Sequence, residues 1–166
     1  MGGARVRKDS ARIGAFGTLD ELGAHLGRAA SDLPQDRTDA AELLLRLQHE
    51  IFVAQGELAA VGSPPGHRIT ERHVRRLETD IDRLSGDLDP LHSFVLPRGT
   101  SAAADLHIAR TVARRAEREL WRLHDAEPVS PELLQWANRL SDLLFALALS
   151  VNHSAKEPEV APDYTI

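Results

Sequence analysis

The chain has 166 residues, of which 42% are hydrophobic and 27% charged, and its formal net charge is −5. This length fits one domain with a core large enough to fold without disulfides or a structural metal. The sequence contains no cysteine, which excludes a thiol nucleophile, a thiolate metal site and a disulfide framework. The negative charge argues against a general nucleic-acid binder, because binding to a phosphate backbone normally needs a strongly basic face.

The distribution of apolar residues argues against a membrane protein. No apolar run approaches the roughly 20 residues of a membrane span, and the N-terminus lacks the charged and then apolar pattern of a signal peptide. We therefore expect a cytoplasmic protein. Aromatic residues make up only 4% of the chain, and the prevalence of Leu, Ala, Arg and Glu favours helix over sheet.

Residues 1–17 are basic and lack periodicity, which predicts a loop or an extended arm. Its cations are either solvated or available to an anionic ligand; they are Arg5, Arg7, Lys8 and Arg12. Thr18 and Glu21 have the spacing of a capping box, which predicts a helix over 19–32. Asp20 lies in its first turn, where the helix dipole favours a carboxylate, so a purely structural role is open for this residue.

Two amphipathic stretches follow. Apolar residues at spacings of four and three predict a long helix over 38–61, which the Gly- and Pro-rich segment 62–66 ends. A third helix is predicted to begin at a Thr70 cap and to end near Gly86. Its apolar positions also share one face, as expected for helices that contribute to one core.

The stretch 94–123 carries a distinctive set of polar residues. It begins as an extended segment, turns at 98–99 and continues as a long helical pattern. Arg110, Arg114 and Glu117 follow one another at spacings of four and three, so their side chains project from one face of the helix. A helical wheel places them at the edge of an apolar stripe. The stripe consists of Leu106, Ala109, Ala113, Ala116, Leu120 and Leu123.

These arginines allow two interpretations. A charged helix edge is often solvated, with the arginine stems covering apolar surface. However, the five arginines between Arg110 and Arg122 repel one another unless anions lie between them. Partly buried guanidinium groups are suited to bidentate recognition of phosphate, so this face is also a candidate polyphosphate site.

A fifth helix is predicted from the Ser130 cap over 131–151, and it is apolar nearly all round. Such a helix is buried on nearly all sides, so its polar residues need partners in protein or ligand. Those residues are Asn138, Arg139 and Asp142. Residues 152–166 lack periodicity and predict a flexible tail. The economical fold is a single-domain, all-α bundle of five helices over 18–151.

Several familiar kinds of site are missing from the sequence. There is no Walker-type phosphate loop, no Rossmann fingerprint and no HExxH motif. The eight histidines are scattered without convincing ligand spacing, so we expect no metal site made of protein side chains alone. A Ser-His-Asp assembly remains open, although nothing marks a nucleophile elbow.

Three separated blocks follow in order, RVRKDSARIGAFGTLDELGAHLG, FVLPRGTSAAADLHIARTVARRAER and WANRLSDLLF. Together they resemble the PduO-type ATP:cob(I)alamin adenosyltransferases, over about residues 5–145. The resemblance implies a five-helix bundle, usually a homotrimer with active sites between subunits. It also implies an enzyme that uses ATP with Mg²⁺, transfers the 5'-deoxyadenosyl group to reduced cobalamin and releases triphosphate.

The resemblance further implies roles for single residues. Lys8 matches a lysine that contacts the nucleotide phosphates, and Asn138 matches an asparagine near the nucleotide. Asp20 and Arg110 match a pair that forms a salt bridge across the subunit interface. Phe94 matches the aromatic residue that packs beneath the corrin ring and helps to expel its lower ligand. The matching nucleotide-binding block comprises Arg114, Arg115, Glu117 and Arg118. The residues expected to act in catalysis are Asp20, Phe94, Arg110 and Arg114.

The chain also departs from the family pattern. Family members begin with a Thr-Gly-Asp-x-Gly segment that wraps the triphosphate, and this chain starts after that segment would have ended. Arg98 and Gly23 stand where glycine and asparagine are usual. One alternative is therefore a non-catalytic cobalamin carrier or sensor without the ATP loop. Another is a helical oligomerisation module whose Arg–Asp pairs are structural.

Overall fold

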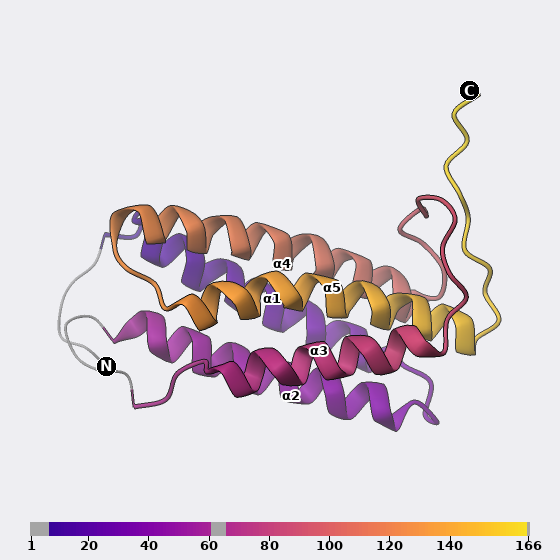
Figure 1. The fold of residues 1–166 in the computed structure, drawn as a ribbon, viewed down its shortest axis with the longest axis horizontal. Helices are drawn as coiled ribbons and strands as arrows, with labels where there is room; N and C mark the ends of the chain where they lie inside the picture. Colours follow the sequence, from indigo (N-terminus) through magenta and orange to yellow (C-terminus); the bar gives the residue numbers. More distant parts are fainter. Residues whose placement is uncertain (1–6, 61–65, 166) are drawn as a thin grey trace.

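The computed structural model describes residues 7–60 and 66–165, and it contains five long helices and no strand within them (Figure 1). The helices are α1 (Ala11–Ser31), α2 (Thr38–Ala59), α3 (Glu71–Gly86), α4 (Ser101–Ala126) and α5 (Pro131–Ser154). The predicted all-α, five-helix fold is confirmed. None of these helices is both long enough and apolar enough to cross a membrane.

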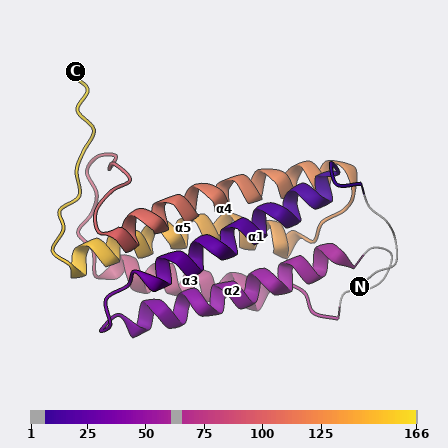
Figure 2. The same ribbon diagram turned by 180° about the vertical axis from the view of Figure 1, so that it is seen from behind.

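The helices lie lengthwise beside one another around one core. Helix α4 packs against α1 on one side and α5 on the other, while α1 also packs against α2 and α5 against α3. Figure 2, from behind, shows α1 between α4 and α2. The apolar stripe predicted for α4 is buried from Leu106 to Leu123, so the periodicity had identified its core face correctly.

Helix α5 is the most deeply buried element, as its sequence predicts. Ser130 caps it by accepting a hydrogen bond from the Leu133 amide at 3.3 Å, and Pro131 occupies the first turn. Trp136 is fully buried, and apolar residues on most sides of the helix belong to the core. The predicted end at Val151 is one turn short, because α5 continues to Ser154.

The prediction for the start of α1 is wrong. The helix begins at Ala11, where the Ser10 hydroxyl accepts a hydrogen bond from the Ile13 amide at 3.4 Å. Thr18 lies inside the helix and donates to the Gly14 carbonyl at 2.8 Å. Residues 11–17 are therefore helical rather than part of an arm. The predictions for residues 1–6, including Arg5, and for 61–65 lie outside the described part of the chain.

The C-terminal segment also differs from the predicted flexible tail. Residues 152–154 belong to α5, and the chain then runs beside the loop that precedes α4 (Figures 1 and 2). The Leu96 amide donates to the Val160 carbonyl at 2.8 Å. The sequence gives no sign of this pairing because it joins two irregular segments without any periodic pattern.

A buried polar network joins α2, α3 and α5. The Trp136 indole donates to Glu50 at 2.8 Å, and Arg46 donates to the other Glu50 oxygen at 2.6 Å. Arg46 also forms an ion pair with Asp80 of α3. Glu50 is only 5% exposed, so its charge depends on these partners for compensation.

We expect Glu50→Ala to lower the free energy of unfolding by about 3–5 kcal/mol, because it leaves the Trp136 donor unpaired and Arg46 short of an acceptor. Glu42→Ala removes an exposed glutamate from the same helix and should change stability by less than about 0.5 kcal/mol. Urea unfolding at equal protein concentration measures both values. Equal effects of the two substitutions would show that the network does not stabilise the fold.

Candidate functional site

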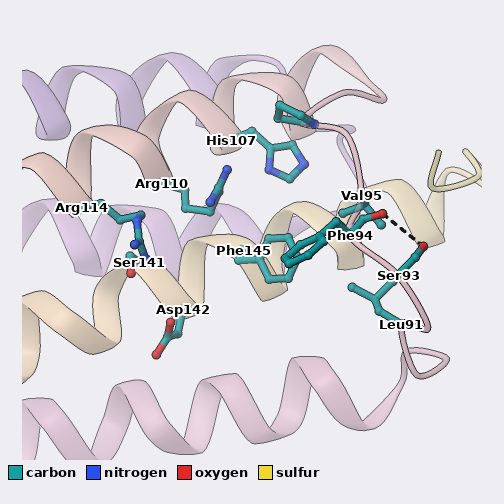
Figure 3. A pocket seen from close by; sticks show the side chains of 11 residues that line it. Leu91, Ser93, Phe94, Val95, His107, Arg110, Arg114, Ser141, Asp142 and Phe145 are labelled. Atoms are coloured by element: carbon teal, nitrogen blue, oxygen red, sulfur yellow. Dashed lines mark hydrogen bonds between the residues drawn. The ribbon is translucent and has the colours of Figure 1, made fainter. Parts of the chain in front are cut away.

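A cavity of about 450 Å³ lies between α4, α5 and the loop before α4 (Figure 3). Three kinds of side chain meet there: the apolar groups of the loop, the basic groups of α4 and the mixed groups of α5. They are Leu91, Ser93, Phe94, Val95, Pro97, His107, Arg110, Arg114, Ser141, Asp142 and Phe145. Two of the predicted arginines and the predicted aromatic residue therefore share one site.

Helical spacing explains the basic wall. His107, Arg110 and Arg114 are three and four residues apart on α4, so they project in nearly the same direction. The Thr100 hydroxyl fixes the start of this helix by accepting a hydrogen bond from the Ala103 amide at 3.2 Å. On α5, Phe145 follows Asp142 by three residues and shares its face. The cavity forms where these two helix faces meet.

Arg110 is the most constrained cation of the cavity. Its guanidinium carbon lies 5.7 Å from the centroid of the Phe145 ring, a cation–π geometry. Its Nε atom is buried and finds no hydrogen-bond acceptor among the described residues. Burial lowers the pKa of Arg110, and the nearby charge of Arg114 lowers it further. An anionic acceptor from outside this chain would pair the Nε donor and would raise the pKa of Arg110 again.

His107 is a pocket residue that sequence reasoning missed. Its side chain is only 2% exposed, and neither ring nitrogen has a hydrogen-bond partner within residues 7–60 and 66–165. Burial, followed by the charge of Arg110, lowers the pKa of the imidazole, which favours the neutral ring. Its ring lies 6.1 Å from that of Phe145. The available signal was its spacing of three from Arg110.

Phe94 forms the opposite, apolar wall. It belongs to the loop before α4, and its side chain is 82% exposed although it lines the cavity (Figure 3). Val95 and Pro97 of the same loop line the cavity too. A large exposed aromatic beside other apolar groups is typical of a surface that is covered by a ligand or a partner.

The remainder of the predicted arginine block lies further along α4. Arg118 is exposed and donates to the Arg114 carbonyl at 3.1 Å. Arg115 faces α1, where it forms an ion pair with Glu21. Glu117 accepts a hydrogen bond from Asn138 at 2.9 Å. The structure therefore brings only part of this block into the main cavity.

Glu117 and Asn138 line a neighbouring hollow of about 300 Å³. The exposed Trp121 also borders it. This hollow lies on the same two helices as the main cavity, because Glu117 and Asn138 continue the facing surfaces of α4 and α5. A ligand with two parts is therefore able to contact both depressions.

Two predicted residues lie away from the cavity. Lys8 and Asp20 are exposed, one before α1 and the other on it, and neither lines the main cavity. No hydrogen bond or ion pair of Asp20 occurs among the described residues of this single chain. The predicted Asp20–Arg110 contact between subunits stays a prediction.

The polar residues of α5 have partners in the protein, as predicted, but they lie at an exposed edge of the helix and not in its buried surface. Asn138, Arg139 and Asp142 are all exposed. Arg139 donates to Asp142 at 2.9 Å and approaches Glu78 of α3 at 3.7 Å. Their partners are thus neighbouring side chains at the open edge of α5.

The described residues contain no group of three or more His, Asp or Glu side chains that could hold a metal ion. Asp142 is the carboxylate of the main cavity, and a single carboxylate suits Mg²⁺ only when other ligands, such as phosphates, complete its shell. The donor set therefore fits a metal that arrives with an anionic ligand.

The helical bundle and the basic and aromatic cavity between α4 and α5 are typical of a helical protein that binds a ligand between its helices. The family described as Cobalamin adenosyltransferase matches residues 1–151. The chain belongs to this family, as the three sequence blocks predicted.

Proteins that are similar in sequence are corrinoid adenosyltransferases. The corrinoid adenosyltransferase of Bacillus subtilis is 41% identical over 152 residues, which cover 90% of this chain and 79% of that protein. The corrinoid adenosyltransferase PduO of Citrobacter freundii is 40% identical over 163 residues. That match covers 95% of this chain, which spans only 48% of the longer protein.

Solved structures agree with the fold. A variant of the PduO-type ATP:corrinoid adenosyltransferase from Lactobacillus reuteri, complexed with ATP, matches with a TM-score of 0.91 and 30% identity. This match covers 97% of this chain and 92% of that one. A second variant, complexed with cobalamin and ATP, has a TM-score of 0.88 and 29% identity and covers 95% and 88% of the two chains.

We expect His107 to make stability depend on pH. Its lowered pKa means that the unfolded chain binds the proton more readily than the folded one. The free energy of unfolding should therefore fall as the pH drops through about 6.5, and level off below the folded-state pKa. His107→Phe should remove this contribution, whereas His67→Gln, at an exposed site, should leave it.

Urea unfolding between about pH 5 and pH 8 measures the effect as the difference between the parent protein and each variant. The same pH slope in the parent and in His107→Phe would contradict the assignment.

Proposed function

We propose that this protein transfers the 5'-deoxyadenosyl group of ATP to cob(I)alamin, giving adenosylcobalamin and triphosphate. The observation that carries the proposal is the cavity in which an exposed Phe94 faces Arg110 and Arg114. This combination suits a ligand pair with one large apolar surface and one polyanionic group. Family membership and the relatives in complex with ATP and cobalamin support the same assignment.

The apolar wall is the proposed corrinoid site. Phe94 would pack beneath the corrin ring and exclude water and the lower axial ligand. Phe145 lies near Phe94 in the cavity (Figure 3) and is held in place by its contact with Arg110. With fewer axial ligands, cobalt is easier to reduce to the nucleophilic Co(I) state.

The basic residues are the proposed nucleotide site. Arg114, Arg115 and Arg118 would stabilise the triphosphate as it leaves, with Lys8 as a further phosphate contact. Glu117 and Asn138 would contact the nucleoside from the neighbouring hollow. Mg²⁺ would be bound mainly by the phosphates, and it supplies neutralisation of their charge.

The reaction needs no nucleophile from the protein, which agrees with the absence of cysteine. The Co(I) electron pair forms the bond to the 5' carbon of ATP. The bond from that carbon to oxygen breaks, and its electron pair leaves with the triphosphate. The chain's residues would act by aligning the two substrates and by stabilising the negative charge on the leaving group.

We infer a homotrimer with sites between subunits, in which Asp20 of one chain pairs with Arg110 of the next. Ile13 and Asp20 are seven residues apart, so they share one outer face of α1, where both are exposed. This face is the proposed contact with the next subunit. The unpaired Nε of Arg110 is a donor that a carboxylate from another subunit could satisfy. A partly desolvated pair of this kind favours one geometry of association.

We expect the protein to form adenosylcobalamin from chemically reduced cobalamin, ATP and Mg²⁺ under anaerobic conditions, as followed by absorbance. Arg114→Ala should lower kcat/KM for ATP by about 100- to 1,000-fold, because it removes a donor to the leaving group. Arg122→Ala is the matched control. Arg122 is exposed on the same helix and pairs with Glu119, so its loss should leave the rate near that of the parent.

The absence of product would contradict the proposed function. Corrinoid binding without product, together with no ATP binding in calorimetry, would favour the carrier instead. If Arg114→Ala affected neither ligand but disrupted the assembly, the oligomerisation module would be favoured.

We expect Asp20→Ala to weaken the trimer. Removing one member of the pair leaves Arg110 unpaired, so the concentration at which the trimer dissociates should rise at least about ten-fold. Asp36→Ala, at an exposed loop site, should have no effect. Light scattering over a dilution series measures the mass. If Asp20→Ala and Arg110→Ala had strictly additive effects, the two residues would not form the proposed pair.

A further inference from the structure

The loop that carries Phe94 is anchored at its far end by a side chain from the last turn of α5. Asn152 is 1% exposed. Its Oδ1 accepts a hydrogen bond from the Thr100 amide at 3.1 Å, and its Nδ2 donates to the Arg98 carbonyl at 3.0 Å. The one amide group therefore holds the backbone on both sides of Gly99.

Gly99 is what allows this close approach. Its φ is +123°, a conformation that residues with a side chain rarely adopt. A Cβ atom placed at Gly99 would lie 2.1 Å from the Asn152 oxygen. Any larger residue would displace the amide, so Gly99 and Asn152 form a matched pair.

Asn152 also holds the C-terminal segment. Its Nδ2 donates a second hydrogen bond, to Glu159 at 2.9 Å, and its backbone carbonyl accepts from the Glu157 amide at 3.0 Å. The segment then returns to the loop through the bond from the Leu96 amide to the Val160 carbonyl. One residue thus joins the end of α5 to the loop and to the C-terminal segment, and these two segments run side by side in Figures 1 and 2.

The chemistry of this site requires an amide. Asparagine supplies one acceptor and two donors, and all three are used here. A carboxylate would direct acceptors at both the Arg98 carbonyl and Glu159. An apolar side chain would leave the part-buried Thr100 amide and Arg98 carbonyl without this partner, which is costly.

Phe94 depends on these anchors. It is 82% exposed and does not belong to the apolar side chains packed against the core. The fixed points nearest to it along the chain toward α4 are the Leu96 amide, the Arg98 carbonyl and the Thr100 amide. If these are released, nothing in the core determines where the Phe94 ring lies.

We propose that Asn152 is a positioning residue for the corrinoid site, acting through Gly99 and the C-terminal segment to hold Phe94 against the cavity. This inference rests on the proposed function. Asn152 lies outside the cavity, yet in this proposal it determines the geometry of the apolar wall. The C-terminal segment then becomes a structural part of that wall.

The test compares Asn152→Ala and Gly99→Ala with the parent protein. Both should lower kcat/KM for the corrinoid by about ten-fold or more while KM for ATP stays within about two-fold, because a displacement of about 1 Å in a positioning group has effects of this size. In the ligand-free protein, the Leu96 and Thr100 amides should exchange hydrogen faster in both variants. Gly99→Ala keeps the test valid if Asn152→Ala fails to fold, since Gly99 lies in a loop.

Two further variants separate positioning from general stability. Glu159→Gln keeps an acceptor for Asn152 and should retain the parent's corrinoid KM. Ser154→Ala removes a polar contact to Arg37 from the same end of α5 and should leave both KM values and the loop exchange unchanged.

Unchanged exchange at Leu96 and Thr100 in both Asn152→Ala and Gly99→Ala would overturn the inference, as would equal losses toward ATP and the corrinoid. If the parent protein made no adenosylcobalamin, the proposed function would fail by itself. Amide exchange and a corrinoid-binding titration would then still decide whether Asn152 positions the loop.

Discussion

The burial of α5 is the constraint on which the rest of the structure depends. Because this helix is apolar on nearly all sides, it lies between α4 and α3 with Trp136 fully enclosed. Only a narrow edge remains open, and there Asp142 and Phe145 reach the cavity. The last turn of the same helix supplies Asn152. A single buried helix therefore supplies one side of the cavity and the residue that anchors the loop on its other side.

The cavity concentrates unsatisfied polar groups beside an apolar surface. Arg110 and Arg114 are like charges on one helix face, and burial lowers the pKa of Arg110. His107 adds two ring nitrogens nearby that have no hydrogen-bond partner in the described part of the chain. Such an arrangement is unfavourable in an isolated chain, because buried donors need acceptors. It would become favourable with an anion, or with the carboxylate of the proposed neighbouring subunit, against it, so the proposal links ligand binding and assembly to the same residues.

Local periodicity predicted most of the fold, and contacts between distant segments explain what it missed. The core faces of α2 to α5 follow from apolar spacing alone. The start of α1 does not follow from apolar spacing, because Gly14 and Gly17 weaken the helical pattern. The capping box at Thr18 also fits a helix start as well as the Ser10 cap does. Packing against α4 overrides this local preference.

The sequence also predicted part of the candidate site. Phe94, Arg110 and Arg114 were identified from spacing and from resemblance, and all three line the cavity. His107 and Asn152 were missed, since their importance comes from burial and from contacts with other segments. No local pattern distinguishes an asparagine that clamps a loop from one that caps a helix or faces water.

The arginines of α4 differ in how firmly their present contacts hold them. Arg115 pairs with Glu21 at a site where both side chains are more than 40% exposed, and such pairs are worth only about 0–1 kcal/mol. In the proposed site a triphosphate would therefore replace Glu21 at little cost. Among the described residues, Arg118 donates to the Arg114 carbonyl, a bond that a phosphate would also replace. Arg110 differs, because its guanidinium lies over the Phe145 ring, a contact that fixes its position. The same helix thus provides a rigid cation beside the proposed corrinoid wall and adaptable cations where the leaving group would be released.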